Sequence, residues 1–225
     1  MSEIESYDEL ARPLRERAAQ RVDPERQAQL QALFAQLERE QAQQAPAVGD
    51  RAPDFVLQEA GTGRTVRLSD AVAAGPVVLS FYRGQWCPYC NLEVRALESI
   101  HDEVRALGGA VYLIGPETEE NALKLREKTE STIPLLFDDS AEVCRAYGLA
   151  FELPAYFQES YRAAGNDLPV ANPGVGWTLP IPATFVIGPD STIAARHLDP
   201  DYRERMEPAD ILAAARAVSG QRRSA

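Results

Sequence analysis

The sequence has only three cysteines, an odd number that is too small for the disulfide framework of a secreted domain. It has no stretch near the roughly 18 consecutive apolar residues that a transmembrane helix requires. Its acidic start, Met1 to Glu5, is not followed by the apolar run of a signal peptide. These absences predict a cytoplasmic protein in a reducing compartment, without a membrane partner.

Positive charge is also scarce. The 23 lysines and arginines face 34 aspartates and glutamates, which gives a net charge of -11. Because nucleic-acid phosphates and anionic membrane surfaces would be repelled, we expect neither as a partner. The composition is otherwise ordinary for a globular protein, and 225 residues suffice for one sizeable core with an appendage.

The first 46 residues contain no glycine and follow a helical pattern. Apolar side chains recur at Leu30, Leu33 and Leu37, and Pro24 is placed as a first-turn residue. A shorter helix is expected before it, over residues 7–21. We therefore predict an N-terminal helical extension over 1–46, whose apolar stripe packs either on the main domain or on a second subunit in a homodimer.

From residue 47 to 220 the patterns of strands and helices alternate, which indicates an α/β sheet covered on both faces. A connection between Gly148 and Trp177 is longer than compact domains usually contain, so we expect it to be functional or to lie at an interface. Strands are expected over 54–58, 64–68, 77–82, 110–114, 135–137, 183–187 and 193–197, with helices from residue 87 and over 118–128, 143–147 and 208–218.

Two cysteines, Cys87 and Cys90, lie three positions apart between an expected buried strand and an expected helix. A helix N-terminus favours a thiolate, so this placement predicts a redox-active dithiol. A structural zinc site is the alternative, but it needs two more soft ligands. Only Cys144, His101 and His197 remain, and none of them comes as a second close pair.

Several segments around this dithiol resemble peroxiredoxins of the AhpC/TSA family. They are the run from Pro76 to Leu97, the stretches 107–114 and 134–139, and the entry segment 48–55. The resemblance covers about residues 47–220. It implies a thioredoxin-like α/β fold with a central mixed sheet, a thiol-dependent antioxidant activity, and no metal or organic cofactor.

Two features depart from the peroxiredoxin pattern. In the motif Pro-x-x-x-Thr-x-x-Cys, Arg83 stands at the proline, Cys87 at the threonine and Cys90 at the peroxide-reducing cysteine. The arginine that peroxiredoxins place on a late strand is replaced by Pro182. Ile181-Pro182 instead resembles the cis-proline dipeptide beside the disulfide of thioredoxins and glutaredoxins. We therefore expect a cis bond there and contact of both residues with substrate.

The roles within the centre stay open at this point. The helix dipole and exposure favour Cys87 as the attacking thiol, whereas alignment with peroxiredoxins favours Cys90. Arg83 either lowers a thiol pKa and holds a peroxide oxygen, or is an exposed loop residue. Trp86 packs beside the centre or shapes a docking surface for substrate. The buried acid of thioredoxins is replaced by Phe81, so no general base is assigned.

Residues outside the centre receive simpler predictions. Cys144 lies on an apolar helix face, so it is expected to be buried and inert rather than a resolving cysteine. His101 and His197 are expected at the surface or in a strand.

The leading hypothesis is a peroxiredoxin-like enzyme that reduces hydroperoxides through a Cys87–Cys90 dithiol and disulfide cycle. A thioredoxin- or glutaredoxin-like protein would regenerate the dithiol. One alternative is a thioredoxin- or glutaredoxin-like reductase of protein disulfides without peroxidase activity. A second is a binding module that senses redox state, suggested by the N-terminal helices and the 148–177 connection.

Overall fold

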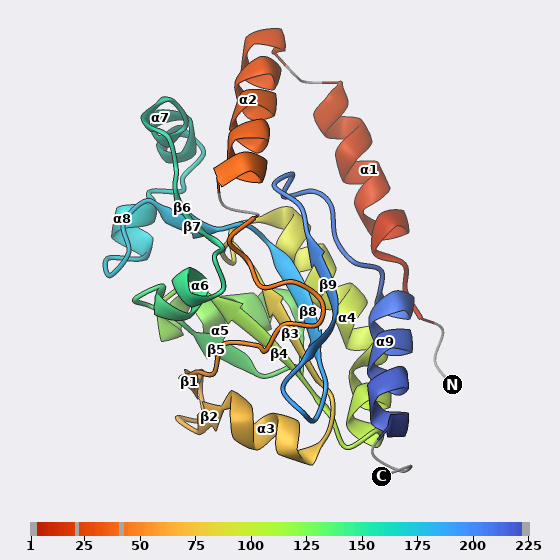
Figure 1. Ribbon diagram of the computed structural model, residues 1–225. Helices are drawn as coiled ribbons and strands as arrows, with labels where there is room; N and C mark the ends of the chain where they lie inside the picture. The colour runs from red at the N-terminus through yellow and green to blue at the C-terminus, as the bar shows by residue number, and fades with distance from the viewer. Residues whose placement is uncertain (1–3, 21–22, 41–42, 222–225) are drawn as a thin grey trace.

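A run of five buried residues, Val77–Phe81, forms the central strand β3 of a seven-stranded mixed sheet (Figure 1). The computed structural model describes residues 4–20, 23–40 and 43–221. In the sheet the order is β2-β1-β5-β4-β3-β8-β9. The other strands are β1 (Val56–Glu59), β2 (Thr65–Arg67), β4 (Ala110–Gly115), β5 (Leu135–Phe137), β8 (Ala183–Ile187) and β9 (Ile193–Leu198), with β6 (Ala150–Glu152) and β7 (Thr178–Pro180) forming a separate pair.

The centre of the sheet is parallel and its edges are antiparallel. Strand β3 runs parallel to β4, which runs parallel to β5, whereas β8 lies antiparallel on the other side of β3. Successive β3 residues face opposite sides: Val78 belongs to one core cluster, and Val77 and Leu79 belong to the other. A strand buried on both faces needs helices on both, as the sequence predicted.

Helices cover both faces of the sheet. The first face holds α4 (Pro88–Ala106), α5 (Glu119–Thr129) and α9 (Pro208–Gln221), and the opposite face holds α3 (Leu68–Ala74) and α6 (Glu142–Ala146). The 148–177 connection contains β6, α7 (Ala155–Ala163) and α8 (Leu168–Ala171), and β7 follows directly after it. This arrangement confirms the predicted mixed α/β fold.

The first N-terminal helix, α1 (Tyr7–Ala19), packs beside α4 and α9 through the buried residues Tyr7 and Ala11. The Tyr7 hydroxyl donates to the Arg203 carbonyl at 2.7 Å. The N–H groups of Tyr7 and Asp8 donate to the Glu207 carboxylate at 3.1 and 2.8 Å. A carboxylate from the far end of the chain therefore caps this helix N-terminus.

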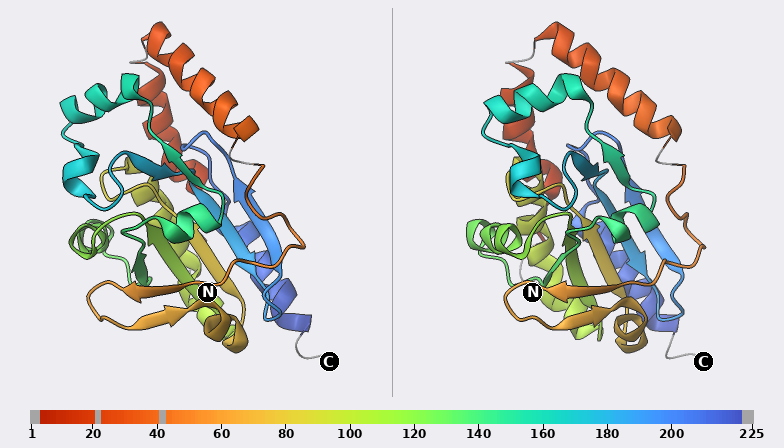
Figure 2. Two further views of the ribbon diagram at one scale, coloured as in Figure 1. Left: turned by 60° about the vertical axis from the view of Figure 1, so that its left-hand side comes forward. Right: turned by 90° about the vertical axis from the view of Figure 1, so that its left-hand side faces the viewer.

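The second N-terminal helix, α2 (Pro24–Glu40), lies near α7 (Figure 2). Its residues Leu33 and Leu37 are buried in a cluster with Phe157 of α7 and with Leu179 and Ile181. The apolar stripe of α2 therefore packs on the main domain, which is one of the two partners predicted for it.

Candidate functional site

The dithiol lies on the turn that joins β3 to α4, at the carboxyl edge of the parallel strands. Cys87 is the N-cap of α4, Pro88 is its first helical residue, and the Cys87 N–H donates to the Gly84 carbonyl at 3.0 Å. A Cβ atom on Gly84 would lie 2.2 Å from the Trp86 indole nitrogen, so only glycine fits there. Trp86 thus packs against the turn that positions Cys87.

Both thiols are free and buried, with 1% of Cys87 and none of Cys90 exposed. Exposure therefore barely separates the two thiols, although it was expected to favour Cys87. The difference between the two cysteines is electrostatic.

Cys87 is the thiol that the surroundings favour as a thiolate. Burial alone raises its pKa, but the hydrogen bond from Cys90 and the charges of Arg83 and Arg205 outweigh burial and lower the pKa of Cys87. For Cys90, burial raises the pKa, and the hydrogen bond and negative charge of Cys87 raise it further. Within the pair, the surroundings therefore favour the negative charge on Cys87 and the proton on Cys90.

Arg83 is buried, with 4% of its surface exposed, so the alternative of an exposed loop arginine is wrong. Its guanidinium carbon lies 4.1 Å from the ring centre of Tyr202 and 5.1 Å from that of Trp86. It also donates a hydrogen bond to the Tyr161 hydroxyl. Aromatic rings from three separate segments thus hold this cation next to the dithiol.

A second buried arginine, Arg205, lies beside Cys90 and was not singled out from the sequence. Its guanidinium donates to the Cys90 sulfur at 3.5 Å and pairs with the Glu93 carboxylate at 2.5 Å. Glu93 also accepts from Ser80 and Thr184, at 3.1 and 3.4 Å. Pro182 occupies the position of the late-strand arginine of peroxiredoxins, and the loop after β9 brings a cation, Arg205, to the thiols.

The structure also shows a buried acid, Glu117, that the sequence analysis missed. Its carboxylate accepts from the Gln85 N–H at 2.9 Å. Burial raises the pKa of Glu117 to about 7, against the lowering effect of that backbone bond and of Tyr82 and Lys128. A carboxyl that ionises near neutral pH is a candidate for proton exchange with the centre. In the sequence, Glu117 is marked only by its position shortly after the end of an expected strand.

The expected cis bond at Pro182 is wrong, because the described part of the chain contains no cis peptide bond. The Ile181 N–H donates to the Leu149 carbonyl at 2.8 Å. Both residues are buried, and Ala183 pairs with Phe81, so Pro182 lies opposite the start of the dithiol turn. Pro182 thus lies next to the dithiol turn in the trans form, and its contact with substrate stays a prediction.

The remaining cysteine and histidines lie away from the dithiol. Cys144 is buried in α6, where burial and then the Asp138 carboxylate raise its pKa, as expected for an inert thiol. His101 is a buried residue of α4 rather than a surface residue, and His197 lies in β9. Within the described ranges, no three His, Cys, Asp or Glu side chains gather in a way that would hold a metal.

No described helix has the length and apolar character needed to cross a membrane. The sheet order, the helix that starts at Cys87 and the proline beside it define a thioredoxin-fold protein with a vicinal dithiol. Residues 48–196 match the AhpC/TSA family, and since this match spans more than half of the chain, the protein belongs to that family.

Relatives of two kinds match. The chain is 34% identical over 114 residues to the thiol-disulfide oxidoreductase ResA of Geobacillus thermodenitrificans, covering 50% of this chain and 63% of that protein, less than two thirds of its length. It is 29% identical over 114 residues to peroxiredoxin Bcp of Bacillus subtilis, covering 51% and 71%. The crystal structure of peroxidoxin BcpB from Mycobacterium tuberculosis superposes with a TM-score of 0.58 at 24% identity, covering 76% of this chain and 97% of that one. That likeness shows the fold.

Proposed function

We propose that this protein is a thiol-dependent oxidoreductase that reduces hydroperoxides. The Cys87 thiolate attacks the outer peroxide oxygen, the O–O bond breaks, and the departing oxygen takes a proton to become an alcohol or water. Cys87 is then a sulfenic acid. The Cys90 thiol attacks its sulfur, a disulfide forms, and water leaves. A thioredoxin- or glutaredoxin-like dithiol protein of the cytoplasm returns both cysteines to thiols by exchange.

One observation carries this proposal: the surroundings of Cys87 favour its thiolate while Cys90 keeps its proton. The attacking group and the resolving group are thus prepared in one turn of helix. Arg83 is the group we propose to hold the thiolate and the leaving oxygen. Glu117 is the group we propose to return the proton.

Burial of the dithiol favours a small oxidant over a protein. With 1% of Cys87 exposed, an extended polypeptide does not reach the sulfur unless the covering side chains move. The similarity to peroxiredoxin Bcp supports the same choice. The similarity to ResA supports a second candidate, reduction of disulfides. The sequence Cys87-Pro88-Tyr89-Cys90, which resembles the centre of glutaredoxins, supports it as well. In that reaction Trp86, Ile181 and Pro182 would contact the substrate.

Stopped-flow oxidation of the reduced protein tests the proposal. Hydroperoxide is expected to oxidise the wild type much faster than a free cysteine, and Cys87→Ser is expected to abolish the reaction. Cys90→Ser should stop at a sulfenic acid that a dimedone-type reagent traps. Cys144→Ser is the matched control and should react like the wild type.

A peroxide rate no higher than that of free cysteine would contradict the peroxidase proposal. Rapid reduction of insulin or of a glutathione mixed disulfide would then support the reductase. If neither reaction occurs and only the affinity for a partner protein changes with redox state, the redox-sensing module is the remaining candidate.

A further inference from the structure

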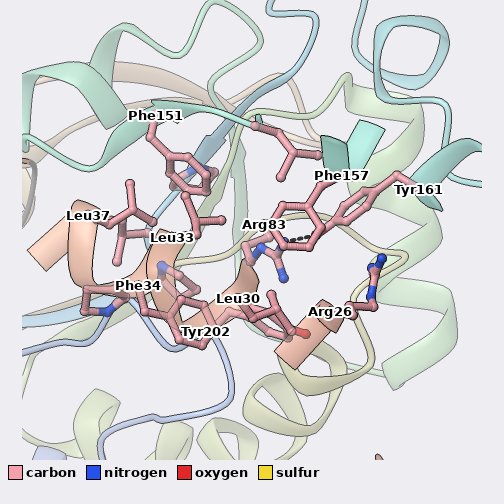
Figure 3. A pocket seen from close by; sticks show the side chains of 15 residues that line it. Arg26, Leu30, Leu33, Phe34, Leu37, Arg83, Phe151, Phe157, Tyr161 and Tyr202 are labelled. Atoms are coloured by element: carbon pink, nitrogen blue, oxygen red, sulfur yellow. Dashed lines mark hydrogen bonds between the residues drawn. The ribbon is translucent and has the colours of Figure 1, made fainter. Parts of the chain in front are cut away.

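A cavity lies between α2 and α7, next to the dithiol turn, and the mechanism above leaves most of it unused (Figure 3). The empty space at this cavity, including its opening to solvent, measures about 450 Å³, and little of it is wide. The cavity is therefore a narrow slot. Its roof is the inner face of α2, where Leu30, Leu33, Phe34 and Leu37 follow helical spacing.

Charge in this cavity has one sign. Arg26 of α2 and Arg83 are its only charged lining residues in the described part of the chain, and no carboxylate lines it. Arg26 lies over the Phe157 ring at 5.2 Å, and Arg83 is stacked among aromatic rings. Neither guanidinium has an ion-pair partner among the described residues. Two arginines without a carboxylate partner stand out on a chain with a net charge of -11, and of the two only Arg83 also faces the Cys87 thiol.

The cavity is also polarised along its length. Figure 3 shows Arg26, Arg83 and Tyr161 toward one end and Leu33, Leu37 and Phe151 toward the other. The helix gives the same order independently, because eleven residues from Arg26 to Leu37 span about 16 Å of axis. One end therefore offers guanidinium groups and a phenol, and the other offers only hydrocarbon.

We propose that this cavity binds a small organic anion with an unbranched apolar body. The anionic group lies between Arg26 and Arg83, two guanidinium groups that no lining carboxylate neutralises. The apolar body lies along α2 toward Leu37 and Phe151 and removes hydrocarbon surface from water. Binding of the anion does not require the thiol reaction, although the two share Arg83.

Binding of decanoate to the reduced protein, without oxidant, tests this site by calorimetry and by the fluorescence of Trp86. Saturable binding is expected. Each methylene removed from the alkyl chain of the ligand should weaken its binding roughly fourfold. Arg26→Gln should weaken it about tenfold or more, because it removes a charge-assisted hydrogen bond. Arg39→Gln is the matched control, since Arg39 is an exposed arginine of the same helix that does not line the cavity.

A second readout uses the neighbouring thiol. An anion beside Arg83 weakens the stabilisation of the Cys87 thiolate, so decanoate is expected to slow alkylation of Cys87 by iodoacetamide in the wild type but much less in Arg26→Gln. Absence of saturable decanoate binding would overturn the proposal. Equal binding of decyltrimethylammonium, or equal losses in Arg26→Gln and Arg39→Gln, would also overturn it. None of these results bears on peroxide reduction, which is measured separately.

Discussion

At the scale of residues, the two cysteines differ through the groups that face them. Cys87 lies at a helix N-terminus and near both buried arginines, whereas Cys90 lies inside the helix against Cys87 itself. Removing one arginine is therefore expected to change the thiolate fraction more than it changes the fold.

We predict that Arg83→Met raises the pKa of Cys87, because it removes a cation that favours the thiolate. At pH 6 the rate of Cys87 alkylation by iodoacetamide should fall about tenfold, and at pH 10 it should be nearly unchanged. Arg95→Met, an exposed arginine of α4, is the control. Equal pH profiles for wild type and Arg83→Met would show that Arg83 does not hold the thiolate.

Glu117 predicts a pH dependence of stability. Its pKa is about 7 in the folded chain against an ordinary 4.5, so between pH 4.5 and pH 7 the folded state holds a proton that the unfolded state has lost. The contribution of Glu117 to the free energy of unfolding is fully present below pH 4.5. It is lost as pH rises through 7, by about 3 kcal/mol.

Glu117→Gln stays neutral, so its stability relative to the wild type should increase by about this amount between pH 5 and pH 8. Urea unfolding at both pH values measures it, with the exposed Glu127→Gln as control. A difference that does not vary with pH would mean that Glu117 ionises normally.

At the scale of elements, the sequence predicted most of the fold and half of the site. Hydrophobic runs identified the strands of the sheet, and Thr118 caps α5 where the pattern placed a helix start. Arg205 and Glu93 escaped prediction because they are 112 positions apart and meet only when the loop after β9 folds onto α4. The cis bond at Pro182 was inferred by analogy with thioredoxins, and the described part of the chain contains no cis bond.

At the scale of elements, the capping of α1 by Glu207 is expected to contribute to the free energy of unfolding. The first N–H groups of the helix bond to Glu207, which precedes α9. Glu207→Gln removes the negative charge at a helix N-terminus and should cost about 1 kcal/mol of unfolding free energy. Hydrogen exchange should increase in α1 first. Glu127→Gln serves as the control, and an equal effect of both variants would exclude the capping role.

At the scale of the whole molecule, the N-terminal helices and the 148–177 connection enclose a centre built on the central sheet. Cys87 is covered although its turn lies at the edge of that sheet. Small reagents should therefore reach the Cys87 sulfur more easily than large ones, because a large reagent requires a larger local opening of the covering side chains.

We predict that iodoacetamide alkylates Cys87 readily in the folded protein, whereas a maleimide linked to a polyethylene glycol chain reacts slowly. Relative to the urea-unfolded chain, the bulky reagent should be slowed at least about tenfold more than the small one. Mass spectrometry of the modified peptides measures both ratios, with Cys144 as the internal reference for a deeply buried thiol. Equal ratios at Cys87 would show that its cover is open.

The bond from the Tyr7 hydroxyl to the Arg203 carbonyl has a consequence for protein engineering and for descent. Arg203 is two positions from Arg205, so helix α1 bonds to the loop that places the Arg205 guanidinium beside Cys90. A chimera that takes its first forty residues from a relative would lose this hydrogen bond unless the loop is exchanged with them. The two segments, nearly two hundred positions apart, are expected to be inherited together.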